Sequence, residues 1–286
     1  MLIADVIELI EGVAPPELAA DWDNVGLQVG SAASETNGCL LTLDVTPQAV
    51  GEARQCGATL LVAHHPLIFS PLRAVTESTV SGQTILAAAR TGVSIYVAHT
   101  NLDCAPHLST TTALADRLGL QLGRPLVVSG AAMPAPVSLE GLSGEDGEPL
   151  ADTAAFRLPG LGMVCEVPEM TLGAFVQYVT PRLGRRETTW VGDAAKLVRS
   201  VALLPGSGSG MVELAAQAAD VLLTGELKYH EARSAEELGL GVVLGGHYQT
   251  ERPVLNHLAR LLKSRLGALQ VSISQLRTDP FQTALG

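Results

Sequence analysis

The sequence predicts an α/β fold of two intertwined or facing domains, each built from related strand–helix–strand units. Short apolar runs of strand length alternate with amphipathic helical segments, an order typical of sheets with parallel strands. The same order occurs in the front half and again in the third quarter, which indicates an internal repeat with little residue identity. Several predicted strands end in histidine or carboxylate residues, and open α/β sheets bind ligands at the carboxyl ends of their strands.

Length and composition set the number of domains and the classes of partner. A chain of 286 residues is long for one hydrophobic core, so we expect a first domain of residues 1–125 with 240–286 and a second of 126–239. Hydrophobic residues make up 47% and charged residues 16%, which is typical of a soluble globular protein. The net charge of −11 and the aromatic content of 3% disfavour nucleic-acid binding, which needs basic and stacking surfaces.

The sequence also predicts a cytoplasmic protein with no membrane partner. Its four cysteines lie far apart and form no Cys-x-x-Cys pair, so buried reduced thiols are expected. The first residues carry acidic side chains where a signal peptide has a basic segment. No apolar run approaches the length that crosses a membrane.

In the front half, two predicted strands end in histidines. The strand at 58–63 is followed at once by His64 and His65. The next strand along the chain is followed by His99 and, four residues later, by Asp103. The predicted elements are helix 2–12, a turn and short strand at 21–30, strand 39–43, helix 46–55, strand 58–63, helix 84–90, strand 93–98 and helix 110–118.

The third quarter is predicted to repeat this order. The strand at 220–223 leads to a segment that ends in His230, and the strand at 241–244 is followed by His247 and Glu251. The other predicted elements are helix 171–184, strand 198–204, helix 211–218, helix 231–238, helix 252–264 and strand 271–274.

Two segments have weaker patterns. Within residues 124–170, Gly, Pro and Ser are frequent from Ser129 to Pro149, and the segment is predicted to form a surface insertion or a hairpin region with weak strands around Val127 and Phe156. The Gly/Ser loop at 206–210 follows a strand and precedes a helix, an arrangement that can bind an anion. It lacks the dinucleotide spacing and the Walker lysine, so a flexible Ser/Gly turn is an equally good interpretation.

The strand-end residues form a set of candidate metal ligands in the crevice between the domains. Three imidazoles and two carboxylates suit Zn, Mn, Fe, Co or Ni and exceed the needs of one tetrahedral ion, so two divalent ions per chain are expected. A carboxylate can bridge two ions that share an acidified water. The expected ligands are His64, His65, Asp103, His247 and Glu251. His99 and His230 also lie at strand ends, and either could be a ligand, but both are expected to support the ligands or to act beside them as acid–base residues.

Each of these residues also has a purely structural interpretation. A single strand-end histidine is more often a hydrogen-bonded core or surface residue than a ligand, and Asp103 alone could be a turn former or N-cap. The adjacent pair His64 and His65 has little packing value, which favours metal binding. The combination carries the prediction, because all five expected ligands fall at predicted strand ends.

Several segments resemble the NGG-interacting-factor-three-like family, whose members are often called GTP cyclohydrolase type 2. The matching segments are Asp23-Asn24-Val25-Gly26-Leu27 with Gly30, Leu43-Asp44-Val45-Thr46, Ala63-His64-His65-Pro66-Leu67, His99-Thr100-Asn101-Leu102-Asp103, Thr224-Gly225-Glu226 with His230, and Gly246-His247 with Glu251. The resemblance implies a two-domain α/β fold, a dinuclear metal centre and a toroidal homohexamer. Position by position, it assigns metal binding to the same five strand-end residues. Long members carry a large inserted domain, and this chain has only residues 124–170 at that place.

The functional hypothesis is a metal-dependent hydrolase that acts on a nucleotide or another small phosphorylated or heterocyclic substrate. The cyclohydrolase name implies hydrolytic opening of the guanine imidazole ring, with His99 or His230 moving protons. A non-catalytic metal-binding or regulatory ring protein is the alternative from another class. A DHH-type phosphoesterase also uses adjacent histidines, but Ala63 stands where that family has an aspartate before the pair.

Overall fold

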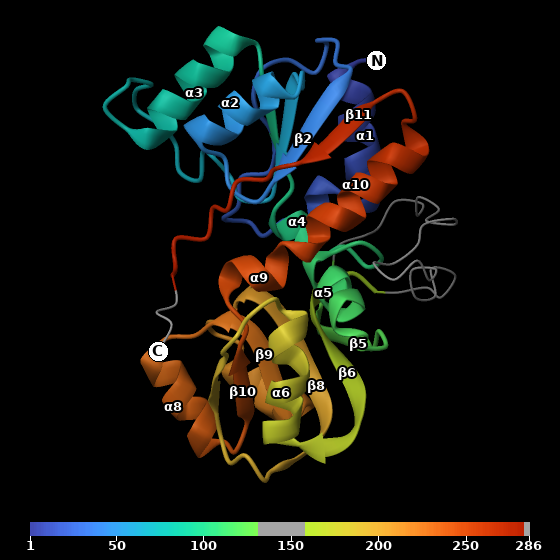
Figure 1. Cartoon of the computed structure of the whole chain (residues 1–286), viewed down its shortest axis with the longest axis vertical. Helices are drawn as coiled ribbons and strands as arrows, with labels where there is room; N and C mark the ends of the chain where they lie inside the picture. Colours follow the sequence, from blue (N-terminus) through green and yellow to red (C-terminus); the bar gives the residue numbers. More distant parts are fainter. Residues whose placement is uncertain (131–157, 283–286) are drawn as a thin grey trace. The chain divides into compact units, whose positions relative to one another are not determined.

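The computed structural model describes residues 1–130 and 158–282. The chain divides into two compact units, unit 1 with Met1–Leu102 and Leu258–Gly286 and unit 2 with Asp103–His257. Each unit contains one β-sheet with helices packed against it, so the predicted α/β fold is confirmed (Figure 1).

The unit boundaries differ from the domain bounds expected from the sequence. Residues 103–125 and 240–257 were expected in the first domain, but they belong to unit 2. The reason is strand pairing, because Arg124–Val128 and Gly241–Leu244 both join the second sheet. The second unit is therefore larger and continuous in sequence.

The sheet of unit 1 has the strand order β1-β4-β3-β2-β11. Strands β4, β3, β2 and β11 are parallel, and β1 pairs antiparallel with β4. The strands are β1 (Gly26–Val29), β2 (Gly38–Thr42), β3 (Leu60–Ala63), β4 (Ser94–Val97) and β11 (Gln270–Ile273). Every residue of β2, β3 and β4 is buried, as expected for parallel strands that are covered on both faces.

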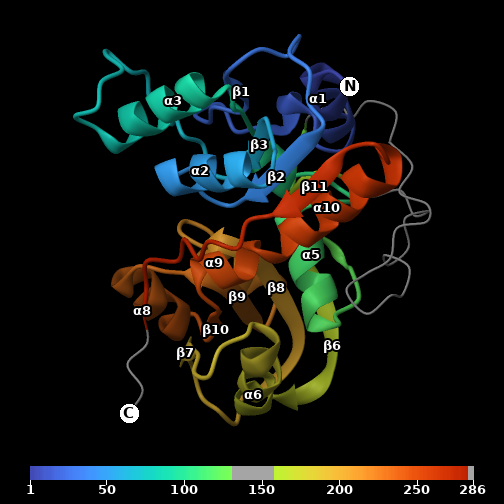
Figure 2. The ribbon, with the colours of Figure 1, turned by 45° about the horizontal axis from the view of Figure 1, so that its top comes forward.

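Helices cover both faces of this sheet. Helices α2 and α3 lie on one face, while α1 and the 258–265 part of α10 lie on the other (Figures 1 and 2). Val50 of α2 and Ala88 of α3 belong to one core cluster with Leu61 and Ile95 of the sheet. The helices of this unit are α1 (Ile3–Val13), the 3₁₀ turn Pro16–Leu18, α2 (Pro47–Gln55), α3 (Val80–Thr91), α4 (Thr100–Asp103) and α10 (Pro253–Arg265), and the last two cross the unit boundary.

The sheet of unit 2 has the strand order β5-β6-β8-β9-β10-β7. Strands β8, β9 and β10 are parallel, and the remaining pairs are antiparallel. The strands are β5 (Arg124–Val128), β6 (Gly160–Thr171), β7 (Thr189–Val191), β8 (Leu197–Ser207), β9 (Val221–Glu226) and β10 (Gly241–Leu244). The sequence placed residues 124–170 in a surface insertion or a hairpin region, and the described part agrees with the hairpin, because β5 pairs antiparallel with the long strand β6. The weak strand expected around Val127 is β5, whereas the one around Phe156 lies outside the described residues.

Two separate clusters hold the helices of unit 2 against its sheet. Leu114 of α5 and Phe175 of α6 pack in one cluster with residues of β6, β8 and β9. Ala215 of α7 and Ala235 of α8 pack in a second cluster with Leu222 and other sheet residues. The helices are α5 (Thr110–Leu118), α6 (Leu172–Arg182), α7 (Val212–Ala218), α8 (Tyr229–Glu237) and α9 (His247–Glu251).

The two units share a pattern of strand pairing, which confirms the predicted internal repeat of elements. In each, three parallel strands are joined by helices, as β2-α2-β3-α3-β4 and as β8-α7-β9-α8-β10. A short strand that precedes the trio, β1 or β7, pairs antiparallel with its third strand. A short helix, α4 or α9, then follows the third strand. The repeat therefore produces two equivalent strand ends that can carry functional side chains.

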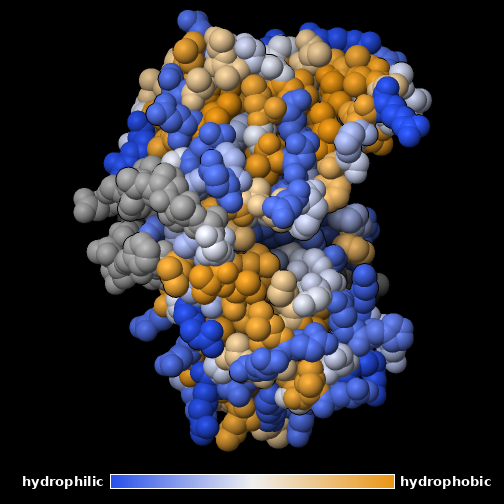
Figure 3. Space-filling view, turned by 180° about the vertical axis from the view of Figure 1, so that it is seen from behind, coloured by the Kyte–Doolittle hydropathy of each residue, from blue (hydrophilic) through white to orange (hydrophobic). Residues whose placement is uncertain are grey.

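The face of the molecule seen from behind carries both apolar and hydrophilic residues on each unit (Figure 3). Among the described residues, no helix has both the length and the apolar character needed to span a bilayer.

Candidate metal centre

Three histidines meet at the carboxyl ends of β3 and β4 in unit 1. The two strands are adjacent and parallel, with Ala63 opposite Val97, so the residues that follow them leave the sheet at the same edge. One ligand atom from each of His64, His65 and His99 lies within 4.8 Å of the others. This is the spacing that side chains need to bind one small ion.

The His64 ring is held by the backbone of the neighbouring strand end. Its Nδ1 lies 2.9 Å from the carbonyl oxygen of Ala98, and the side chain is buried. A carbonyl oxygen can only accept a hydrogen bond, so Nδ1 donates the proton. His64 can therefore coordinate a metal only through Nε2, the arrangement common to metal-binding histidines.

His65 is oriented by a carboxylate from the next strand. Its Nδ1 lies 2.8 Å from Oδ1 of Asp44, which follows β2. The other oxygen of Asp44 accepts a hydrogen bond from the Thr278 hydroxyl in the segment after β11. A chain of contacts from Thr278 through Asp44 thus fixes the ring, and Nε2 is again the coordinating atom.

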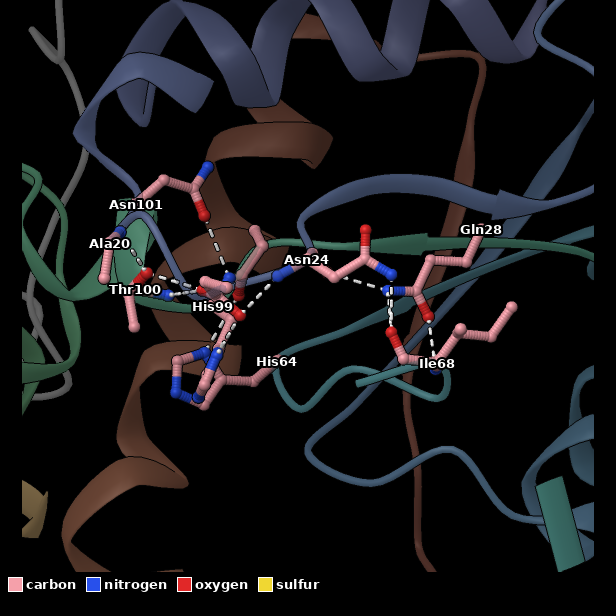
Figure 4. A network of polar contacts seen from close by, with 10 residues as sticks. Ala20, Asn24, Gln28, His64, Ile68, His99, Thr100 and Asn101 are labelled. Atoms are coloured by element: carbon pink, nitrogen blue, oxygen red, sulfur yellow. Dashed lines mark hydrogen bonds and ion pairs between the residues drawn. The ribbon is translucent and has the colours of Figure 1, made fainter. Parts of the chain in front are cut away.

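His99 is oriented by a second carboxylate, Asp23. His99 Nδ1 lies 2.9 Å from Asp23 Oδ1, and the backbone N–H of Thr100 donates to Oδ2 at 3.0 Å. Burial disfavours the charged form of Asp23, but hydrogen bonds from His99 and Thr100 outweigh it and lower the pKa of this carboxyl far below its usual range. Asn101 supports the same turn, because its Oδ1 accepts a hydrogen bond from His99 N (Figure 4). Its Nδ2 donates to the Ala14 carbonyl.

In unit 2, a histidine and carboxylates meet at the ends of β9 and β10. His247 and Glu251 both lie on the short helix α9, with His247 Nε2 3.1 Å from Glu251 Oε1. Glu226, the last residue of β9, places Oε1 3.4 Å from His247 Nδ1. Glu251 is buried, whereas Glu226 is half exposed. Here carboxylates touch both nitrogens of the imidazole, unlike in unit 1.

Two glycines make room for this cluster. A Cβ atom on Gly206 would lie 2.1 Å from Glu251 Oε1 and 3.4 Å from His247 Nε2. A Cβ on Gly225 would lie 2.7 Å from His247 Cα. Gly206 also has φ of +69°, a conformation that L residues rarely adopt. The Gly residues in the 206–210 and 224–226 segments thus allow the close approach of α9 to the strand ends.

The two remaining predicted site residues of unit 2, Asp103 and His230, contact other residues. Asp103 ends α4, and its Oδ1 accepts a hydrogen bond from the Thr110 hydroxyl. His230 is exposed in the first turn of α8, where its ring contacts Tyr229. No contact of His230 with His247 or Glu251 is found among the described residues. Its acid–base role stays a prediction.

The Gly/Ser loop at 206–210 surrounds a carboxylate of the chain itself. The Gly210 N–H donates to Glu231 Oε1 at 2.7 Å, and the Ser209 hydroxyl donates to Oε2 at 2.8 Å. These hydrogen bonds lower the pKa of Glu231 despite the opposing effect of its desolvation. The donors that could have bound an external anion are thus satisfied internally, which favours the turn interpretation.

Sequence reasoning missed the residues that orient the histidines. Asp23 was assigned to a turn, Asp44 to a strand end and Glu226 to a family motif, but none of them received a role at the site. A usable signal existed for Asp44, because it follows β2, the parallel neighbour of the strand that ends in His64. No signal in the sequence pointed to Thr278, which lies 234 residues from Asp44.

The fold and these clusters define a two-unit α/β protein with imidazole and carboxylate groups at the strand ends of both sheets. The chain belongs to the Duf34/NIF3 (NGG1p interacting factor 3) family, whose model matches residues 1–280. The family resemblance found in the sequence motifs is thereby confirmed.

Similar proteins cover nearly the whole chain. It is 31% identical over 285 residues to a Clostridium perfringens protein named GTP cyclohydrolase 1 type 2 homolog, with 99% of each chain covered. It is 27% identical over 263 residues to a Helicobacter pylori protein named GTP cyclohydrolase 1 type 2, with 92% of each covered. The crystal structure of a Bacillus cereus protein related to NIF3 matches with a TM-score of 0.84 and 28% identity, covering 99% of both chains.

Proposed function

We propose that this protein binds two divalent transition-metal ions and is a metal-dependent hydrolase of a nucleotide or another small phosphorylated or heterocyclic molecule. The observation that carries the proposal is the shared orientation of the three histidines in unit 1. Each uses Nδ1 for a carboxylate or carbonyl oxygen, so each coordinates through Nε2. Such hydrogen bonds are typical of metal-binding histidines. In a histidine with a purely structural role, they would only restrict the rotation of the ring.

The proposed ligand set combines the strand ends of both units. Unit 1 provides neutral nitrogen donors, and unit 2 provides His247 with the buried carboxylate of Glu251. Together with Asp103 they form a mixed N/O set that suits Zn, Mn, Fe, Co or Ni. The expected ligands remain His64, His65, Asp103, His247 and Glu251. Two ions need more donors than either unit offers in this set, which is why we propose that the units share them.

The residues around the ligands suit hydrolysis. A bound divalent ion supplies Lewis acidity and an acidified water. Asp23 accepts the hydrogen bond of His99 Nδ1, so it fixes the tautomer and the orientation of the ring. His99 can then carry a proton on Nε2 to or from a reacting group. The names of the relatives support GTP as the first substrate to test.

Metal content is the direct test. Protein grown and dialysed with added Mn, Fe and Zn is expected to hold about two ions per chain by elemental analysis. The double variant Asp103→Ala with Glu251→Ala is expected to lose them, while the exposed His230→Gln is expected to keep them. A wild-type protein that stays metal-free under these conditions contradicts the proposal.

Turnover separates the hydrolase from a non-catalytic metal-binding ring. The metal-loaded protein is assayed on GTP and on a panel of phosphoesters, beside the Glu251→Ala variant. Turnover that the variant loses supports the hydrolase, and metal-loaded protein that converts none of them supports the alternative. The mass in solution tests the proposed homohexamer, which requires six times the chain mass of 29.7 kDa.

A further inference from the structure

An aromatic pair is exposed on the surface of unit 1. Trp22 is 61% exposed and Phe69 is 54% exposed, although both are large apolar side chains. Their ring centroids lie 5.8 Å apart with an interplanar angle of 50°. Leu72 and Val75, which follow Phe69 in the same loop, are also exposed. Exposed aromatic groups that touch one another are typical of binding surfaces rather than of an ordinary solvated face.

The pair borders the histidine cluster. The Trp22 ring centroid lies 6.3 Å from that of His99, with the rings nearly perpendicular at 72°. The His99 ring in turn lies 5.1 Å from His64 and 5.8 Å from His65. A fused bicyclic ring that stacks on Trp22 and Phe69 would therefore be long enough to contact His99.

Hydrogen bonds hold the pair in place. Asn24 donates to the Ile68 carbonyl, and Gln28 Oε1 accepts from Ile68 N at 2.8 Å, so the backbone just before Phe69 is tied to β1 (Figure 4). Asp23, between Trp22 and Asn24, is fixed by His99 and Thr100. The short segment 22–24 thus anchors the aromatic pair and orients the histidine at once.

We infer that Trp22 and Phe69 form a subsite that stacks a planar heteroaromatic ring, such as a nucleobase, beside His99. Base–aromatic stacking needs an exposed ring face in a fixed place, and neither contact of Trp22 is a parallel stack that would cover its face. The His99 ring supplies a polar neighbour for ring nitrogens or carbonyl groups. The identification of this ring as a substrate rests on the proposed function, whereas its binding does not.

Fluorescence gives the first test. The chain has two tryptophans, so in a Trp190→Phe variant all tryptophan emission comes from Trp22. Guanosine is expected to quench this emission saturably because its base stacks on the indole. Ribose 5-phosphate, which has no aromatic ring, is expected to leave the emission unchanged. Equal responses to both compounds, or no saturable response to guanosine, overturn the inference.

Leucine variants give the second test. Trp22→Leu and Phe69→Leu keep an apolar side chain but remove the ring, and each is expected to weaken guanosine binding roughly 5- to 150-fold by calorimetry. Trp22→Phe is expected to recover most of the affinity. Phe281→Leu is the matched control, because Phe281 is 70% exposed in the same unit and lies outside the Trp22–Phe69 pair. Unchanged affinity in both ring-deletion variants overturns the inference.

Two further measurements distinguish the possible failures. Metal content is expected to be unchanged in Trp22→Leu, since the side chain is exposed and the Asp23–His99 contact remains. Metal-loaded protein that does not bind guanosine overturns the subsite and leaves the proposed metal site intact. Protein that binds guanosine but holds no metal contradicts the proposed metal site and leaves the subsite intact. If Trp22→Leu changes the mass in solution but not the guanosine affinity, a second copy of the chain occupies the patch, and the inference is overturned.

Discussion

The two units place chemically different groups at equivalent strand ends. In unit 1 the side chains that face one another are imidazoles, and the carboxylates Asp23 and Asp44 stand behind them on Nδ1. In unit 2 a single imidazole, His247, is contacted directly by Glu226 and Glu251. One unit thus presents neutral nitrogen donors with their orientation fixed, and the other presents negative charge.

The difference shows how a repeated fold can carry different side chains at the same position in each copy. The backbone pattern of three parallel strands and a following short helix is the same in both units. What differs is the position of the carboxylates, which contact only Nδ1 of His65 and His99 but contact both ring nitrogens of His247. Divalent ions of the first transition row accept both nitrogen and carboxylate donors, so the proposed metal site would use both kinds of group.

The largest effect is expected from closing the space beside Glu251. Gly206→Ala places a methyl carbon 2.1 Å from Glu251 Oε1 and displaces that carboxylate, so the variant is expected to lose nearly all bound metal by elemental analysis. Gly210→Ala is the matched control, because its φ of +80° imposes a similar backbone strain of ~1 kcal/mol while no atom lies within 4 Å of the new Cβ. Equal metal content in the two variants would contradict the role assigned to unit 2.

A large effect is also expected from the carboxylate behind His65. Asp44→Asn keeps the shape of the side chain but removes its charge, and it is expected to weaken metal binding roughly 10- to 100-fold in a competition titration. The corresponding change in unit 2, Glu226→Gln, is expected to cost less, because Glu226 is half exposed and 3.4 Å from His247. A larger loss of metal affinity in Glu226→Gln than in Asp44→Asn would contradict this difference between the two units.

The Asp23 carboxylate is expected to stabilise unit 1 in a pH-dependent way. Its folded pKa is lowered, so its ionised form favours folding above the unfolded value of 3.8, and this contribution is lost as the pH falls through the folded pKa. In metal-free protein, Asp23→Asn is expected to lower the free energy of unfolding by ~2 kcal/mol at pH 7.

Denaturant titrations between pH 2 and 7 provide the measurement. The difference between wild type and Asp23→Asn is expected to be constant above about pH 5 and to shrink below about pH 4. Asp5→Asn on the exposed surface of α1 serves as a control that changes one carboxylate without this set of hydrogen bonds. A difference that stays constant down to pH 2 would contradict the lowered pKa.

The smallest effect is expected from the hydroxyl that supports Asp44. Thr278→Val removes the donor while keeping the side-chain shape, and it is expected to weaken metal binding about threefold, within the lower part of the range for such supporting contacts. Thr278→Ser retains the hydroxyl and is expected to restore wild-type affinity. Identical affinities for the valine and serine variants would show that the tail does not position His65.

Hydrophobic periodicity in the sequence predicted most helices and strands. It failed where apolar residues were interrupted by glycine, proline or polar residues. The helical spacing of Ile3, Val6 and Ile10 gave α1, and all three are buried. Strand β6 was missed although Met163 and Cys165 alternate with less buried residues, because its glycines and proline resemble a loop. Strand β7 has three residues, too few for any period to show.

The sequence by itself determined the α/β class, the repeat of elements, the family and the meeting of His64 with His65 at a strand end. These features depend on the order and spacing of residues along short stretches, where backbone geometry leaves few choices. Only the tertiary structure decided that Asp44 and Thr278 hold His65 and that Glu231 fills the Gly/Ser loop. Such contacts join residues far apart in the chain, and their partners are selected by packing of whole elements rather than by local pattern.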